Sequence, residues 1–296
     1  MDRKRISMLL GDLGILTVAL IWGATNVVIR GALSGITPFW FCGLRFMLAF
    51  FTLLLLFGKR ACAMPRKIRA TGTAIGAIFV CAYLVGAVAL LYTTAGNQSF
   101  IISMSVVFVP LCIWAYTRKF PGWHIAGAVV LCTAGMAGLM LDGNLNLNVG
   151  DALCFASMVF VSAHIMLVQR FVQGADPYGL ACWQAFGGML ASLACALLFE
   201  PFPADISTPA WLAVVYAATI GFALTLVLQN TAQQHTTATH AAILLSLSGV
   251  FGSVIGVIFL GEPMTSRIFL SSATILAGVL LAEAIPSAGK RRNGGK

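Results

Sequence analysis

One arginine, Arg45, stands near the middle of a long apolar segment, residues 36–57. At the centre of a membrane-spanning helix an arginine costs roughly 2.5–3.5 kcal/mol on insertion scales, so an arginine there marks a functional site by default. If it faces a cavity, its planar guanidinium can hold a carboxylate or a phosphate through two parallel hydrogen bonds. The alternative is a structural arginine that donates hydrogen bonds to backbone carbonyls between helices.

His164 is a second ionisable residue placed deep in an apolar segment. The ordinary pKa of histidine, about 6.5, would let it carry a proton between two states of the protein. Asp12, Asp151 and Glu283 all lie near the ends of apolar segments, so we do not expect a relay of carboxylates. His164 is therefore the candidate for proton coupling, and a polar histidine with satisfied hydrogen bonds is the alternative.

Trp22 and Asn26 are four residues apart and therefore share one face of a helix. Trp22 lies midway along its segment, away from the interfacial belt where tryptophan is usual in membrane proteins. An aromatic ring beside an amide suits a cavity wall that binds an amphiphilic solute, although simple packing explains the pair equally well. Tyr83, also deep in its segment, has the same two interpretations. Further hydrogen bonds to a solute could come from polar residues of the second half: Gln184, Gln229 and Asn230.

The composition indicates that lipid surrounds these residues. Of 296 residues, 59% are hydrophobic and 9% are charged, whereas a soluble domain has roughly 25% charged residues. The net charge of +9 would suggest nucleic acid in a soluble protein. Here the basic residues lie in short loops between apolar runs, so no nucleic-acid partner is expected. The eight cysteines and four histidines show no metal-ligand spacing, so no metal or cofactor is expected either.

Crossing a hydrocarbon core of about 30 Å takes about twenty apolar residues in a helix. Ten runs near that length predict an all-α membrane protein with ten transmembrane helices: residues 11–32, 36–57, 73–93, 98–116, 123–141, 149–168, 178–199, 211–228, 239–260 and 268–285. With a cytoplasmic N-terminus, all 18 Lys and Arg residues except Arg30, Arg45 and Arg267 fall on the cytoplasmic side. This partition predicts a multi-pass protein of a bacterial-type cytoplasmic (inner) membrane with both termini in the cytoplasm.

The second half of the chain repeats features of the first half at a constant offset of 139 residues, the separation of Gly11 from Gly150. The offset aligns these pairs: Gly11-Asp12 with Gly150-Asp151, Gly35 with Gly174, Pro38 with Pro177, Arg45 with Gln184, and Tyr83 with Phe222. We therefore expect two repeats, residues 1–145 and 146–296. Each contains five spans, an odd number, so the two must insert in opposite orientations. Inverted repeats around a central site are typical of secondary transporters. A repeat can also be a duplicated folding unit in a structural protein that transports nothing.

Several short segments resemble a known family. Leu20–Asn26 (LIWGATN) and Gly43–Phe46 (GLRF) resemble the first half of the drug/metabolite transporter superfamily. Thr237–Phe251, followed by Leu260–Pro263 (LGEP) and Ala277–Val279, is similar to the signature of its EamA branch. The resemblance implies that helices one to four and six to nine surround a central cavity, with helices five and ten at the periphery. It also implies export or exchange of small metabolites, commonly amino acids or related compounds.

Together these features predict a secondary transporter that exports or exchanges a small polar or amphipathic metabolite, such as an amino acid, by alternating access. The expected partners are the small-molecule substrate and the lipid bilayer, with a proton as the candidate coupling ion. The spacing of Gly249, Gly252 and Gly256 allows close helix approach, so a monomer and a dimer both remain open. A channel and a membrane-embedded enzyme are the alternatives. The enzyme is disfavoured because the spans contain no clustered carboxylates and no nucleophile paired with a base.

Overall fold

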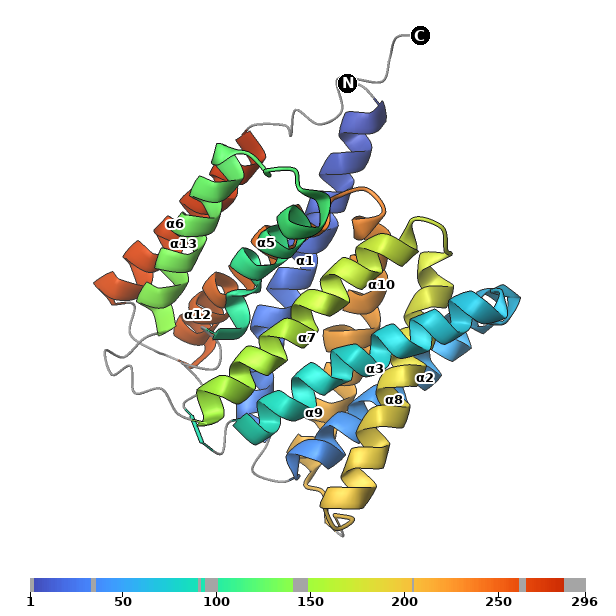
Figure 1. Ribbon diagram of the computed structural model, residues 1–296. Helices are drawn as coiled ribbons and strands as arrows, with labels where there is room; N and C mark the ends of the chain where they lie inside the picture. Colours follow the sequence, from blue (N-terminus) through green and yellow to red (C-terminus); the bar gives the residue numbers. More distant parts are fainter. Residues whose placement is uncertain are drawn as a thin grey trace.

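The computed structural model describes residues 3–32, 36–89, 92–93, 101–140, 149–203, 205–260 and 265–284, and the regular structure in these ranges is helical (Figure 1). The first half forms α1 (Arg3–Ala32), α2 (Pro38–Ala63), α3 (Arg66–Ala89), α5 (Ser105–Thr117) and α6 (Trp123–Met140). The second half begins with α7 (Val149–Val172) and α8 (Pro177–Phe199). Then α9 (Thr208–Ala218), the π-helix η2 (Thr219–Leu224) and α10 (Thr225–Gln233) follow as one continuous helical segment. The chain continues with α11 (Ala238–Leu245), α12 (Leu247–Leu260) and α13 (Ser266–Ala284).

These helices correspond to the ten predicted spans, which confirms the all-α membrane fold. Within the described residues, seven helical segments are long and apolar enough to cross a membrane, and three shorter apolar helices accompany them: 101–117, 123–138 and 266–282. The predicted start of the fourth span at Gln98 lies outside the described residues, as do Gly35, the boundary between residues 145 and 146, and Gly261-Glu262-Pro263 of the resemblance.

The turn between α2 and α3 is shorter than the apolar runs suggest. The second span was expected to end at Phe57 and the third to begin at Thr73, but α2 continues to Ala63 and α3 already begins at Arg66. The apolar run ends where the chain leaves the lipid, whereas the helix continues until a residue that interrupts helical structure. That residue is Pro65, which forces Met64 into an extended conformation (ψ 143°).

The aligned prolines of the two repeats have the same structural role. Pro38 and Pro177 each occupy the first turn of their helix, α2 and α8, where the missing N–H of proline is not needed. Before α8, the Asp176 side chain also caps the helix by accepting a hydrogen bond from the Gly179 N–H at 2.8 Å. The sequence offset therefore matches a structural equivalence at this turn.

Contacts of the two aligned glycines support the same register. Gly11 on α1 packs against Ala232 near the end of α10, and Gly150 on α7 packs against Thr93 just beyond α3. The offset that carries Gly11 onto Gly150 also carries Thr93 onto Ala232. The same contact between the two halves therefore occurs twice, with the roles of the halves exchanged.

Helices α2 and α8, which are counterparts in the two repeats, run antiparallel. At one end the Glu200 carboxylate after α8 accepts hydrogen bonds from the backbone N–H groups of Phe39 and Trp40 at the start of α2 (3.0–3.2 Å). At the other end Arg60 of α2 pairs with Asp176 before α8 at 3.4 Å. Equivalent helices that run in opposite directions are what an inverted repeat requires.

The last helices of the two repeats, α6 and α13, pack on each other at one edge of the bundle (Figure 1). Gly135 of α6 approaches Ser271 and Ile275, and Gly278 of α13 approaches Ala128 and Cys132, so this pair is antiparallel as well. Their place at the edge agrees with the peripheral position that the family resemblance implies for helices five and ten.

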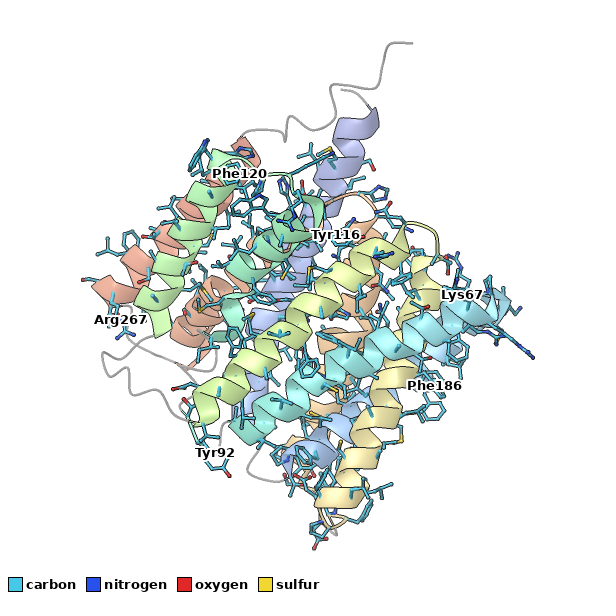
Figure 2. The ribbon with its side chains drawn as sticks, viewed as in Figure 1. Lys67, Tyr92, Tyr116, Phe120, Phe186 and Arg267 are labelled. Atoms are coloured by element: carbon cyan, nitrogen blue, oxygen red, sulfur yellow. The ribbon has the colours of Figure 1, made fainter. Side chains whose placement is uncertain are left out.

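The two ends of the bundle differ in charge. Figure 2 places Lys67 and Tyr116 toward one end, and Tyr92 and Arg267 toward the opposite end. We call the first the basic end, because it carries the α2–α3 turn with Lys59, Arg60, Arg66, Lys67 and Arg69.

Candidate functional site

Arg45 of α2 is buried, with 3% of its surface exposed, and aromatic rings surround its charge. The guanidinium carbon lies 4.9 Å from the centre of the Tyr83 ring, 5.5 Å from that of Phe222 and 5.8 Å from that of Phe46. All three distances fall within the range of cation–π attraction, about 6 Å. Arg45 is therefore held by ring faces.

No carboxylate of the described residues forms an ion pair with Arg45. The ion pair that these residues do contain joins Arg60 to Asp176, near the surface. The Nε atom of Arg45 is buried and has no hydrogen-bond partner in the described structure. The Nε atom therefore forms no bond to a backbone carbonyl in the described structure, and no carboxylate of the described residues neutralises the buried charge.

His164 of α7 is completely buried and lies flat against Phe79 of α3. The centres of the two rings are 3.9 Å apart and their planes differ by 13°. Neither ring nitrogen has a hydrogen-bond partner within the described part of the chain. A neutral imidazole has one donor and one acceptor, and each buried polar group left unsatisfied costs about 1–3 kcal/mol. Within the described structure, His164 therefore keeps a donor and an acceptor that are not satisfied.

Phe79 joins the histidine to the arginine. Its ring centre is 5.2 Å from that of Tyr83, 5.9 Å from that of Phe222 and 6.3 Å from that of Trp22. Four of the candidates from the sequence therefore meet around three phenylalanines. We call this group the central cluster: Trp22, Arg45, Phe46, Phe79, Tyr83, His164 and Phe222.

Both halves of the chain build the central cluster. Helices α1, α2 and α3 supply the first five members, α7 supplies His164, and η2 supplies Phe222. Helices α3 and α7 run side by side through the bundle (Figure 1), which brings Phe79 against His164. The cluster thus lies where the two inverted repeats meet.

The π-helix η2 positions Phe222 over Arg45. A π-helical turn inserts an extra residue, changes the face that later residues present, and is frequent at functional sites. Just beyond it, the Thr225 hydroxyl donates to the Gly221 carbonyl at 2.9 Å and accepts a hydrogen bond from Trp22 Nε1 at 3.2 Å. The hydrogen bond from Trp22 to Thr225 therefore links α1 to the helical segment that carries Phe222.

The amide candidates form a second group, which lies toward the basic end. Asn230 Nδ2 donates to Gln184 Oε1 at 3.3 Å and to the Pro177 carbonyl at 3.2 Å. Gln229 Nε2 donates to Gln233 Oε1 at 3.3 Å, and Gln233 Nε2 donates to the Ile165 carbonyl at 3.1 Å. We call this group the amide cluster: Gln184, Gln229, Asn230 and Gln233. All four are completely buried.

The amide cluster is displaced from Arg45 along the helices. Gln229 follows Phe222 by seven residues, about 10 Å at the rise of an α-helix. Gln184, the counterpart of Arg45 in the repeat, contacts Asn230 and packs against Gly76, where any side chain would collide with the backbone of α8. Asn26 belongs to α1, but its side chain lies outside the described residues.

The structure adds Phe46, Phe79, Phe222 and Gln233 to the candidates from the sequence. The signal for Phe222 was its alignment with Tyr83 in the repeat, since both rings cover Arg45. Phe46 is the last residue of the GLRF segment of the resemblance, whereas Phe79 carried no signal, because it is one of 20 phenylalanines in the chain. The side chains of the central cluster close over one another, with Phe46, Phe79, His164 and Phe222 at most 2% exposed.

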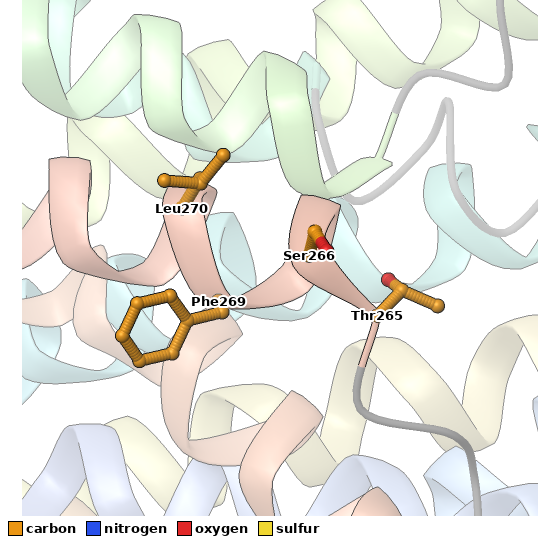
Figure 3. A pocket seen from close by; sticks show the side chains of 4 residues that line it. All are labelled: Thr265, Ser266, Phe269 and Leu270. Carbon is orange, nitrogen blue, oxygen red and sulfur yellow. The ribbon is translucent and has the colours of Figure 1, made fainter.

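A shallow pocket of about 450 Å³ lies elsewhere, at the start of α13 (Figure 3). Its lining side chains are Thr265, Ser266, Phe269 and Leu270, of which the last two are 64% exposed. None of them carries a charge. An exposed apolar surface on a peripheral helix is expected to face lipid, so the central cluster remains the candidate site.

Comparison with known proteins gives a family, a relative and a fold. The model of the EamA-like transporter family matches twice, over residues 9–141 and 148–283. A protein of Archaeoglobus fulgidus named as an uncharacterized transporter is 32% identical over 277 residues, which cover 93% of this chain and 86% of that protein. A crystal structure of another protein superposes with a TM-score of 0.80 at 18% identity, over 93% of this chain and 96% of that one. At that identity the third match shows the fold alone.

Proposed function

Because the chain belongs to the EamA-like transporter family of the drug/metabolite transporter superfamily, we propose that it is a secondary transporter that exports or exchanges a small polar or amphipathic metabolite. The substrate binds at the central cluster. Amino acids are one class of solute that meets this description.

The observation that carries the proposal is the unsatisfied polarity of the central cluster. Arg45 is a buried cation with no paired carboxylate among the described residues, and both nitrogens of His164 lack partners there. Burying such groups costs several kcal/mol unless something compensates them. A transported solute with an anionic or polar group supplies that compensation when it binds, and loses it again when it leaves.

Alternating access follows from the two equivalent contacts at opposite ends of the bundle. Gly11 against Ala232 closes the interface of the halves near the basic end, and Gly150 against Thr93 closes it near the other end. If the repeats, residues 1–145 and 146–296, rock about the central cluster, one contact opens while the other stays closed. Rocking of inverted repeats around a fixed site is the general mechanism of such carriers.

The amide cluster serves as the gate on the basic side. Its hydrogen bonds join α10 to α7 and α8, and Gln173 Nε2 adds a bond to the Gln233 carbonyl at 3.0 Å. Side-chain amides are suited to this task because they exchange their partners for water as the gate opens. By the positive-inside rule the basic end faces the cytoplasm of a bacterial-type cell, and both termini lie on that side of the inner membrane.

Proton coupling is assigned to His164, since no acidic residue lies at the depth of the central cluster. A proton taken up by His164 from one side and released to the other would link the gradient to solute movement. The carrier works as a monomer or as a dimer.

Counterflow in proteoliposomes tests the proposal. Liposomes loaded with unlabelled solute should accumulate the labelled solute transiently, with saturable kinetics, and Arg60→Ala should behave as wild type because Arg60 is an exposed surface residue. Arg45→Ala should abolish the accumulation while expression stays normal. A current that does not saturate would indicate a channel, and formation of a chemical product would indicate an enzyme.

A further inference from the structure

None of the nine acidic residues lies in the middle of a predicted span of the sequence: Asp2, Asp12, Asp142, Asp151, Asp176, Glu200, Asp205, Glu262 and Glu283. Asp12 precedes Trp22 on α1 by ten residues, about 15 Å along the helix, and Asp151 precedes His164 on α7 by about 20 Å. Glu200, the acid that approaches α2, accepts the N–H groups of Phe39 and Trp40 at the start of that helix. Within the described part of the chain, the central cluster therefore offers one positive charge and no side-chain carboxylate that could hold an ammonium group.

The faces of aromatic rings in the cluster already contact Arg45 and His164. The guanidinium of Arg45 lies over Tyr83 and Phe222, and the imidazole of His164 covers Phe79. An aromatic face can bind an ammonium group by cation–π attraction. Here a second cation would have to share those faces with Arg45 and would be repelled by it.

Three hydroxyl groups near the cluster donate to backbone carbonyls. Thr225 donates to Gly221 at 2.9 Å, Ser157 donates to Ala82 at 2.7 Å, and Thr25 donates to Ile21 at 2.7 Å. Each therefore has its donor hydrogen occupied within its own or a neighbouring helix. A solute rich in hydroxyl groups would find these three donors occupied, whereas an apolar body finds Phe46, Phe79 and Phe222.

Building on the proposed function, we infer that the central cluster selects a monoanion with a flat or branched apolar body and no cationic group, of the monocarboxylate class. The carboxylate forms two hydrogen bonds with the Arg45 guanidinium, and an orphan nitrogen of His164 binds a polar atom of the solute. A dianionic phosphate is disfavoured because Arg45 is the one Lys or Arg that the sequence places in the middle of a span. The zwitterion of an amino acid with the same body binds more weakly, since its ammonium group lies beside Arg45 with no carboxylate to hold it.

A charge series on one body tests this selection without any substitution in the protein. The purified protein in proteoliposomes is assayed by competition and counterflow with 3-phenylpropionate, phenylalanine, phenethylamine and the neutral 3-phenylpropionamide. A second series uses 4-methylpentanoate, leucine and isoamylamine, and a sugar and a nucleoside are included for breadth. The anion of each series should compete at a concentration at least about tenfold lower than the zwitterion, because like charges at a buried site are strongly disfavoured.

Two variants are compared with the wild type: Arg45→Gln, and Arg60→Gln as its control. In Arg45→Gln the apparent affinity for 3-phenylpropionate should fall to that for its neutral amide, which itself should change little. Arg60→Gln, whose parent side chain is 57% exposed, should keep the wild-type series. If Arg45→Gln does not fold, the wild-type charge series still decides the question.

The outcomes separate this inference from the proposed function. Saturable counterflow of a zwitterion, a cation, a sugar or a nucleoside at equal or better affinity than the anions overturns the inference and leaves transport standing. Absence of saturable counterflow for every solute of the panel overturns both. Preference for the anions, lost in Arg45→Gln, supports both.

Discussion

Replacing Arg45 with methionine should leave the ligand-free protein about as stable as the wild type, although the change removes a buried side chain. Arg45 is 3% exposed and has no paired carboxylate among the described residues. On insertion scales an arginine at this depth costs roughly 2.5–3.5 kcal/mol. Methionine fills nearly the same length without a charge and adapts to irregular spaces.

The attraction of Arg45 to its rings works against that gain. Tyr83, at 4.9 Å, contributes up to about 2 kcal/mol because the pair is desolvated, and Phe222 and Phe46, at 5.5 and 5.8 Å, add about 0.5 kcal/mol each. The cost of burying the Arg45 charge and the attraction between Arg45 and its rings therefore nearly cancel. We therefore expect Arg45→Met to change the free energy of unfolding by at most about 0.5 kcal/mol in either direction, as replacement of a buried charge by an apolar residue is often nearly neutral.

Thermal unfolding of the purified protein in lipid nanodiscs measures this effect, with and without a transported solute. Arg45→Met should unfold at about the same temperature as wild type, and should lose the stabilisation that the solute gives the wild type. An arginine fixed by hydrogen bonds to carbonyls would instead lose about 1.5–3 kcal/mol per bond. A clear drop in the unfolding temperature of ligand-free Arg45→Met would refute our account of Arg45.

Three further predictions concern coupling, packing and topology. His164→Ala should replace a pH-dependent transport rate with a flat pH profile, and an unaltered profile would rule out His164 as the proton carrier. Gly187→Ala should destabilise the protein by about 1–3 kcal/mol, because the new Cβ would collide with the Thr73 carbonyl across α3 and α8. Gly174→Ala is the matched control, since no atom lies within 4 Å of its Cβ position; equal stability of the two variants would contradict the packing. Cysteines introduced by Lys67→Cys and Tyr92→Cys should react with a membrane-impermeant reagent from opposite sides, and labelling from one side only would disprove the inverted insertion.

The number of spans and the repeat could be predicted because both depend on patterns with a simple physical origin. Lipid requires long apolar runs, and a duplication preserves the spacing of glycines and prolines that helix contacts and helix starts need. The aligned Gly11 and Gly150 make equivalent contacts in the structure, and Pro38 and Pro177 begin equivalent helices. The helix ends near Phe57 and Thr73 could not be predicted. An apolar run shows which residues lie in lipid, but a hydrogen-bonded helix can extend beyond the lipid.

The candidate site could be predicted only in its polar members. Arg45 and His164 stand out because each is costly in lipid, and the structure brings them together around Phe79 and Phe222. The alignment with Tyr83 in the repeat is the one signal for Phe222, and nothing in the sequence distinguishes Phe79 from other phenylalanines of the spans. The π-helix that turns Phe222 toward Arg45 also has no local sequence signature.

Two-sided labelling at the central cluster tests the account most directly. The probe is Tyr83→Cys, in a chain whose eight native cysteines have been replaced. We predict that a membrane-impermeant thiol reagent modifies it from either side of the membrane, and that a transported anion slows both reactions. Modification from one side only, or at a rate that no transported solute changes, would contradict alternating access to Arg45.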